Sequence, residues 1–247
     1  MKPSASRGFT LIELLVVIAI ISLLVSILMP SLKRAKYLTL RTMCASNQHN
    51  LGLGMHQYNM EYGGLPIGHY GYMGQHKWGS YMMNWGNSPE ANMLLGKLWH
   101  GELAVDGRLF YCPLESEDER LMYNTEYNTW PPEEGTTFCR SSYGTRPSIS
   151  WNHFWWPNNM PELPSSLPAQ TAMLSDYVFG PDSLKRHPEG VNVSYGDGSS
   201  HWVEVERFQN SLDDLPRGPL TGVVGAAYDE AYLSEDGTSG LWADFDR

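Results

Sequence analysis

The chain has 247 residues, of which 42% are hydrophobic, 12% aromatic and only 18% charged. This length allows one domain or two small ones, with a hydrophobic core of ordinary size. The formal net charge of −10 argues against nucleic acid and anionic lipid head groups as partners. The low charge content, with 24 Gly and 16 Pro, indicates a loop-rich β-containing domain outside the cytoplasm and excludes a helical bundle.

The first element is an apolar run from Phe9 to Met29, in which Glu13 is the only ionisable residue. As a helix this run is roughly 30 Å long, about the thickness of a bilayer's hydrocarbon core. A carboxylate in lipid costs about 2.5 kcal/mol or more, so Glu13 needs a partner. If the chain were cut after Gly8, the new amine on Phe9 would lie one helical turn before Glu13, where opposite charges can meet.

The residues around Gly8 resemble the prepilin signature of type IV pilins and type II secretion pseudopilins. From position 8 the chain reads Gly-Phe-Thr-Leu-Ile-Glu-Leu, after a leader (1–8) that is basic and has no acidic residue. The resemblance implies that a membrane peptidase cuts after Gly8 and N-methylates Phe9, and that Glu13 pairs with the amine of a neighbouring subunit. A secretory signal peptide or a plain signal anchor is the alternative. However, a signal peptide has its apolar core before the cleavage site, and no A-x-A-like site follows this run.

Beyond the apolar run, the helix is expected to continue through Pro30 to about Tyr62. Four apolar or aromatic residues form one amphipathic stripe in this part: Leu51, Met55, Tyr58 and Tyr62. A Gly-Gly pair and a proline directly after the stripe are a helix stop signal. The sequence therefore predicts one helix of around 80 Å, with a transmembrane and assembly part (9–29) and an amphipathic continuation (30–62). A soluble loop-rich β domain (63–247) follows.

Three cysteines are present, Cys44, Cys112 and Cys139. They form no C-x-x-C spacing, so the sequence contains no zinc or thioredoxin-like motif and predicts no metal site. Outside the cytoplasm a disulfide can form. Cys112 and Cys139 are the expected pair because both lie in the soluble part, which would leave Cys44 free. Unpaired buried thiols are the alternative.

Two aromatic clusters lie in the soluble part. The first contains Trp78, Tyr81, Met82, Met83 and Trp85, and the second is the run 151–157. Such clusters either pack in a core or against another subunit, or lie exposed and stack on sugars. Short strands are expected at 108–112, at 141–151 and at 171–174.

A β-hairpin is predicted near the C-terminus, over 187–205. Apolar residues alternate with polar ones before and after a Gly-Asp-Gly-Ser turn. His187, nine further residues and then Asp197-Gly198 resemble the H-x(9)-D-G box that accompanies prepilin leaders in one large group of pilin-like proteins. We expect Asp197 and Gly198 to make the turn and His187 to bond locally. A His-Asp catalytic pair is the alternative, but no nucleophile or third group has a recognisable context, so no enzyme is predicted.

The C-terminal tail is acidic. After Asp213 it contains Asp229, Glu230, Glu235, Asp236, Asp244 and Asp246. Calcium requires several oxygen ligands at close range, and the spacing here does not match the EF-hand loop. Solvated charge is therefore the expectation. Some pseudopilins carry calcium in C-terminal loops, so structural calcium stays an open alternative, and no other cofactor is predicted.

The resemblance implies a pilin-like α+β fold, in which the long N-terminal helix packs on a C-terminal antiparallel sheet. It implies a structural subunit of a type IV pilus or a type II secretion pseudopilus. The expected partners are prepilin peptidase, like or related pilin subunits, and the inner membrane. The chain would cross that membrane once, with its C-terminal domain extracytoplasmic, and then enter a surface or periplasmic filament. The rival hypothesis is a binding module for polysaccharide that uses the pilin helix only as an anchor.

Overall fold

The structure is a computed structural model of the chain. It describes residues 9–66, 81–85, 94–116, 118–131, 138–147, 167–178, 180, 184–215, 233 and 238–247. Among the sequence expectations, the 151–157 aromatic run and four of the tail acids, Asp229, Glu230, Glu235 and Asp236, lie outside these residues. So do Gly8 and Trp78.

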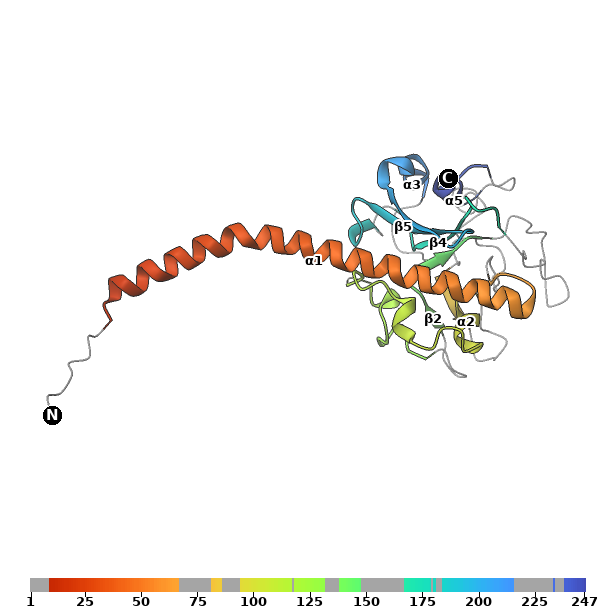
Figure 1. Cartoon of the computed structure of the whole chain (residues 1–247), viewed down its shortest axis with the longest axis horizontal. Helices are drawn as coiled ribbons and strands as arrows, with labels where there is room; N and C mark the ends of the chain where they lie inside the picture. The colour runs from red at the N-terminus through yellow and green to blue at the C-terminus, as the bar shows by residue number, and fades with distance from the viewer. Residues whose placement is uncertain are drawn as a thin grey trace. The chain divides into compact units, whose positions relative to one another are not determined.

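The dominant element is helix α1 (Leu11–Tyr62), which has 52 residues and includes Pro30 (Figure 1). The expectation of one helix that ends at Tyr62 is confirmed. The helix stops where Gly63 takes a left-handed conformation with φ +77° and donates its N–H to the carbonyl oxygen of Asn59. Glycine adopts this conformation without the steric penalty that a side chain brings.

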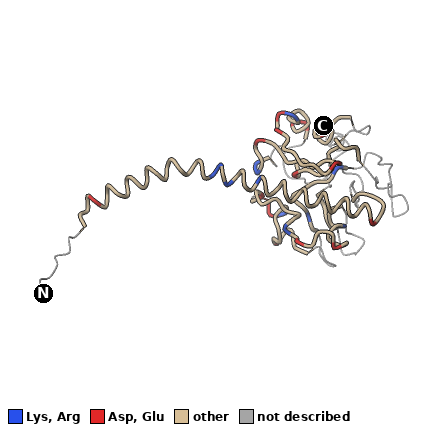
Figure 2. Tube along the Cα trace, viewed as in Figure 1, with Lys and Arg blue, Asp and Glu red and all other residues tan. Residues whose placement is uncertain are grey.

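The chain divides into two compact units, Met1–Leu40 and Arg41–Arg247. In the first unit, the large apolar side chains of α1 from Leu11 to Leu32 are exposed, while Tyr37 and Leu40 are partly buried. This part of α1 carries no charge between Glu13 and a basic cluster that begins at Lys33 (Figure 2). The helix contains a window long and apolar enough to cross a membrane, and none of that window is buried.

The described residues of the second unit form two antiparallel sheets. The larger has the order β3 (Tyr143–Thr145), β4 (Ala172–Asp176), β5 (Gly190–Tyr195) and β6 (Ser200–Glu204). The smaller pairs β1 (Met82–Trp85) with β2 (Phe138–Arg140). The expected α+β, pilin-like layout is therefore confirmed: a long N-terminal helix followed by an antiparallel sheet.

The described residues also form short helices: α2 (Gly96–His100), α3 (Gln209–Asp214), α5 (Leu241–Phe245) and the 3-10 turns η3 (Gly107–Phe110), η4 (Glu119–Leu121) and η7 (Val205–Arg207). The strand expected at 108–112 is wrong, because η3 occupies most of that stretch. The side chain of Asp106 accepts a hydrogen bond from the backbone N–H of Arg108 at 2.9 Å. This local cap favours a helical turn over an extended chain.

Among the described residues of the second unit, the two largest hydrophobic cores lie on opposite sides of the sheet region. The first joins α1 to α2 and β4, and includes Leu51, Met55, Leu98 and Met173. The second joins the sheet to α3 and α5, and includes Val191, Val193, Tyr195, Val203, Phe208, Leu212, Trp242 and Phe245. Residues of a strand point alternately to its two faces. On β5 the apolar alternates therefore enter the second core, while Asn192 faces α1 and donates to the carbonyl oxygen of Arg41.

Candidate functional site: the N-terminal signature and a buried cluster at the disulfide

Glu13 lies in the first turn of α1 and bonds back to Thr10. Its Oε2 accepts hydrogen bonds from the backbone N–H of Thr10 at 2.9 Å and from the Thr10 hydroxyl at 2.7 Å. The backbone N–H of Glu13 donates to the Thr10 hydroxyl oxygen at 3.3 Å. This reciprocal arrangement is a capping box, which satisfies donors that the helix start would otherwise leave unpaired. Phe9, expected to become the new terminus, directly precedes the box and is 72% exposed.

The apolar side chains that follow this box cover every side of the helix. From Leu11 to Met29 the large hydrophobic side chains are at least 44% exposed. A helix that is apolar all round is stable only in lipid or among other apolar helices. This stretch can therefore serve as a membrane span and as a surface for packing against other helices.

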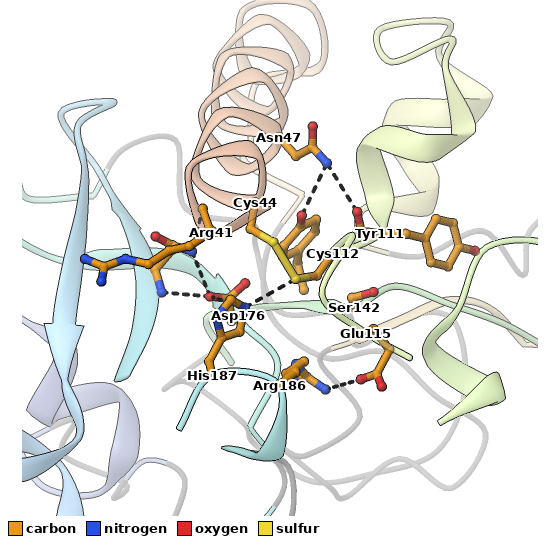
Figure 3. Close-up of a disulfide and its surroundings, with 12 residues drawn as sticks. Arg41, Cys44, Asn47, Tyr111, Cys112, Glu115, Ser142, Asp176, Arg186 and His187 are labelled. Carbon is orange, nitrogen blue, oxygen red and sulfur yellow. Dashed lines mark hydrogen bonds and ion pairs between the residues drawn. A yellow bond between two sulfur atoms is a disulfide. The ribbon is translucent and has the colours of Figure 1, made fainter. Parts of the chain in front are cut away.

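A disulfide joins Cys44 of α1 to Cys112, which lies just after η3, with a Cα–Cα distance of 5.2 Å (Figure 3). Cys139 is free and buried. The expected pair of Cys112 with Cys139 is thus wrong. Cys44 is not free, because it belongs to the same buried stripe of α1 as Gln48, Leu51 and Met55. The spacing of four, three and four residues along this stripe is the signal that identifies Cys44 as a core residue.

His187, the first residue of the H-x(9)-D-G box, lies against this disulfide. Its Nε2 is 3.2 Å from the Sγ of Cys112 and 3.3 Å from the Oδ2 of Asp176 at the end of β4. His187 and Asp176 are both buried. The backbone of His187 bonds locally, as expected: its N–H donates to the carbonyl oxygen of Leu184, and its own carbonyl oxygen accepts from Gly190. Its side chain contacts more distant residues, since its carboxylate partner is Asp176 and its sulfur contact is 75 residues away.

Asp176 is held by hydrogen bonds from two further elements. Its Oδ1 accepts from the side-chain amide of Gln48 at 3.0 Å. Its Oδ2 accepts from the backbone N–H of Asn192 at 2.7 Å and from the Asn192 side-chain amide at 3.0 Å. Burial alone would raise the pKa of Asp176, but the charge and hydrogen bond of His187 and the bond from the Asn192 N–H together lower this pKa below its usual value. The buried carboxylate is therefore ionised.

A second buried ion pair lies beside His187 and Asp176 (Figure 3). Arg186 donates to Glu115 at 2.5 Å, and each side chain is 5% exposed. Arg186 also donates to the carbonyl oxygen of Tyr177. Buried charges are tolerated when they are paired and hydrogen-bonded in this way.

Asp197 and Gly198 form the turn between β5 and β6. Gly198 has φ +80°, and its N–H donates to the carbonyl oxygen of Tyr195 at 2.9 Å. The Asp197 carboxylate accepts from the hydroxyl and backbone N–H of Ser199, and from Arg247 at 2.9 Å. These bonds lower the pKa of Asp197 to about 2. The two ends of the H-x(9)-D-G box thus lie at separate sites. Asp197 lies at the hairpin tip, and His187 lies at the buried disulfide.

Two of the tail carboxylates are engaged by protein groups. Asp246 forms an ion pair with Arg146 at 2.7 Å and accepts from the backbone N–H of Ala172 at 2.7 Å. Asp244 accepts from the hydroxyl of Ser211 at 2.6 Å. The contact of Asp246 with Ala172 holds the C-terminal segment against strand β4. Structural calcium in the tail stays a prediction.

The aromatic surface required by the binding-module hypothesis gains no support from the described part of the chain. Tyr81, Met82 and Met83 are all buried. Tyr81 packs on Tyr177 with ring centroids 4.1 Å apart. In the first aromatic cluster, these three residues therefore belong to the core.

A family model described as the prokaryotic N-terminal methylation motif matches residues 3–29. This match supports a type IV pilin-like protein. It also implies processing by prepilin peptidase and assembly with other pilin subunits. The match covers the leader and the apolar part of α1. No curated protein and no solved structure matches the chain.

The buried cluster brings together residues that sequence reasoning kept apart. Cys44, Cys112, Asp176 and His187 place their potential ligand atoms within 4.8 Å of one another, and all four are buried. Cys112 and His187 were singled out from the sequence, but for other partners. Asp176 was missed because it ends a buried strand with no motif around it. Ser175 and Asp176 are two consecutive polar residues after three apolar ones, and this pattern does not indicate the distant partners of Asp176.

Proposed function

We propose that the chain is a structural subunit of a filament of the type IV pilus or type II secretion pseudopilus class. The observation that carries this proposal is the N-terminal segment of α1. A methylation motif is followed by a helix that is apolar on every side and exposed, with one carboxylate held in its first turn. A lone membrane anchor has no need for that carboxylate, whereas a bundle of such helices can use it to set their register.

The geometry of the first turn supports this route of processing and assembly. Cleavage after Gly8 would leave a free amine on Phe9, directly before the capping box. The two bonds from Thr10 both end on Oε2 of Glu13, so within the described residues Oε1 remains able to accept from a neighbour's amine. In a low-dielectric bundle, such an ion pair is much stronger than it is in water. Lateral packing of the apolar side chains would drive association, and the ion pair would fix the axial position.

The second unit would lie outside the cytoplasm. The basic leader favours the cytoplasmic side for the N-terminus. The Cys44–Cys112 disulfide is consistent with an oxidising compartment for the rest of the chain. We therefore infer an inner-membrane protein that crosses the membrane once before it joins a surface or periplasmic filament.

The test uses Glu13→Leu in the full chain. Removing the charge should leave membrane insertion intact, since Leu is favourable in lipid. Cleavage after Gly8 should also persist, and mass spectrometry should find N-methylated Phe9 as the first residue of both proteins. The yield of sheared filaments at matched expression should fall strongly for the variant. Equal yields, or an intact Met1 in wild type, would contradict the proposal.

A further inference from the structure

Four side chains of the metal-binding type converge inside the second unit. Cys44 comes from α1, Cys112 from the segment after η3, Asp176 from the end of β4 and His187 from the segment before β5. Their sulfur, oxygen and nitrogen atoms lie within 4.8 Å of one another, and none of the four is more than 3% exposed. Figure 3 shows the His187 ring and the Asp176 carboxylate next to the disulfide. In this oxidised state the two sulfurs bind each other.

We propose that, when the disulfide is reduced, Cys44, Cys112, Asp176 and His187 bind one Zn²⁺ ion. Zinc prefers four ligands in a tetrahedron, drawn from cysteine sulfur, histidine nitrogen and carboxylate oxygen. A Zn–S bond of about 2.3 Å places two sulfurs about 3.8 Å apart. The present cluster needs only a small opening to reach that geometry. Two thiolates among the ligands disfavour calcium and magnesium, which take oxygen.

The groups around the cluster already orient two of its ligands. Gln48 and Asn192 hold the Asp176 carboxylate by three hydrogen bonds, at 3.0, 2.7 and 3.0 Å. His187 packs edge-on against Trp202 and turns its Nε2 toward Cys112 and Asp176. Hydrogen bonds to metal ligands fix their orientation and raise the affinity of the site. Asp176 and His187 would therefore be held in place before the ion arrives.

The two states interconvert by thiol–disulfide exchange with an external dithiol. The dithiol transfers two electrons and two protons to the Cys44–Cys112 bond, and is itself oxidised to a disulfide. Zn²⁺ then displaces the two thiol protons and the proton that the Nε2 of His187 shares with Asp176, and all of them pass to solvent. His187 coordinates through Nε2, and its ring proton lies on Nδ1, which has no hydrogen-bond partner within the described residues. Both states link α1 to the segment that carries Cys112, covalently through the disulfide or through the metal, and the metal would also link it to Asp176 and His187.

The experiment uses the full chain in detergent micelles. The protein is reduced with dithiothreitol, freed of the reductant without oxygen, and titrated with Co²⁺ as a coloured substitute for Zn²⁺. The reduced chain should bind one Co²⁺ with tetrahedral d–d bands and thiolate charge-transfer absorption, and Zn²⁺ should bleach both. The oxidised chain should show neither.

Variants assign the ligands. Cys44→Ser and Cys112→Ser should each lower the charge-transfer absorption, and His187→Gln should lower the affinity with both thiolates retained. Gln48→Leu removes only a hydrogen bond to Asp176, so it should weaken Co²⁺ binding by about 10- to 100-fold. Cys139→Ser is the matched control, because Cys139 is a buried thiol outside the cluster. Its spectrum should equal that of wild type.

Circular dichroism of the same samples makes every outcome decisive. If reduction unfolds the second unit and Zn²⁺ restores its structure in wild type but not in Cys44→Ser, the proposal is supported. A reduced, folded chain without tetrahedral Co²⁺ bands would overturn it. So would an unfolded chain that Zn²⁺ does not restore, or equal bands in wild type and Cys44→Ser.

Discussion

The Nε2 of His187 lies 3.2 Å from the Sγ of Cys112, although 75 residues separate them in the chain. This contact connects the H-x(9)-D-G box to the disulfide that holds α1. The other end of the box also reaches α1, since the carbonyl oxygen of Gly198 is 3.1 Å from the Nδ1 of His49. The box therefore contacts the helix directly at its turn and indirectly through the disulfide. We infer that its structural role is to dock the second half of α1 on the sheet.

Loss of the disulfide should strongly destabilise the second unit. Cys44 and Cys112 are 68 residues apart. In the chain-entropy model, a cross-link that closes a loop of that length lowers the entropy of the unfolded chain and so stabilises the folded state by about 4 kcal/mol. Cys44→Ser should therefore lower the free energy of unfolding by about this amount in denaturant titrations under oxidising conditions. Cys139→Ser is the control and should cost much less. Equal losses in the two variants would contradict the assigned pairing.

Substitution of His187 should be costly because its partner is buried. His187→Ala leaves the ionised Asp176 without its main charge partner inside the protein. Removing one member of a buried pair typically costs about 3–5 kcal/mol. Thermal or denaturant unfolding should show this loss. In Asp176→Asn the charge is absent, and the further effect of His187→Ala should be smaller. Additive effects in the double variant would mean that the two side chains are not coupled.

The hairpin turn gives a prediction that separates backbone strain from packing. A Cβ added to Gly198 would meet nothing within 4 Å, so a side chain fits, but the φ of +80° is unfavourable for it. Gly198→Val should therefore destabilise the second unit by about 1 kcal/mol or more. Gly198→Asn should cost less, because Asn tolerates the left-handed region. Similar losses for Val and Asn would show that strain at this position is not the cause.

Much of the fold could be predicted because its signals are local. The apolar run and the stripe that ends at Tyr62 predict α1 from side-chain spacing alone. The alternation of residues around Asp197-Gly198 predicts the β5–β6 hairpin. The strand expected at 108–112 is a 3-10 turn for a local reason as well, the Asp106 cap. A short apolar stretch by itself does not distinguish a strand from a helical turn.

The buried cluster could not be predicted because it depends on contacts between distant segments. Cys44 reaches Cys112 because its face of α1 points into the core. The expected pairing of Cys112 with Cys139 does not take that helix face into account. The partner of His187 is a strand-end carboxylate, Asp176, with no motif of its own. Sequence spacing reveals metal-type clusters only when the ligands are close in the chain. Here four separate segments supply them.

The hairpin tip should respond to pH through Asp197. Its pKa is lowered from the ordinary 3.8 to about 2 by hydrogen bonds from Ser199 and by Arg247. A lowered pKa means that the ionised form stabilises the folded state. This contribution is fully present above about pH 4 and is lost as pH falls through about 2. NMR titration of the Asp197 carboxyl should show the low midpoint, and Arg247→Gln should raise it. An unshifted midpoint in wild type would contradict the bonds at the tip.

The capping box gives the last prediction, which separates the helix start from the assembly charge. Thr10→Val removes the hydroxyl that donates to Glu13 at 2.7 Å, and with it a helix cap worth about 1 kcal/mol. The charge of Glu13 remains, but its carboxylate is held less firmly. The first turn should fray, and the filament yield should fall between wild type and Glu13→Leu.

Thr10→Ser retains the hydroxyl, so it is the matched control and should assemble like wild type. Cleavage after Gly8 should persist in both Thr10 variants, as shown by the mass of the mature N-terminus. If Thr10→Val assembles as well as Thr10→Ser while Glu13→Leu does not, Glu13 acts in assembly without the capping box. If Thr10→Val fails as completely as Glu13→Leu, positioning by Thr10 is as necessary for assembly as the charge itself.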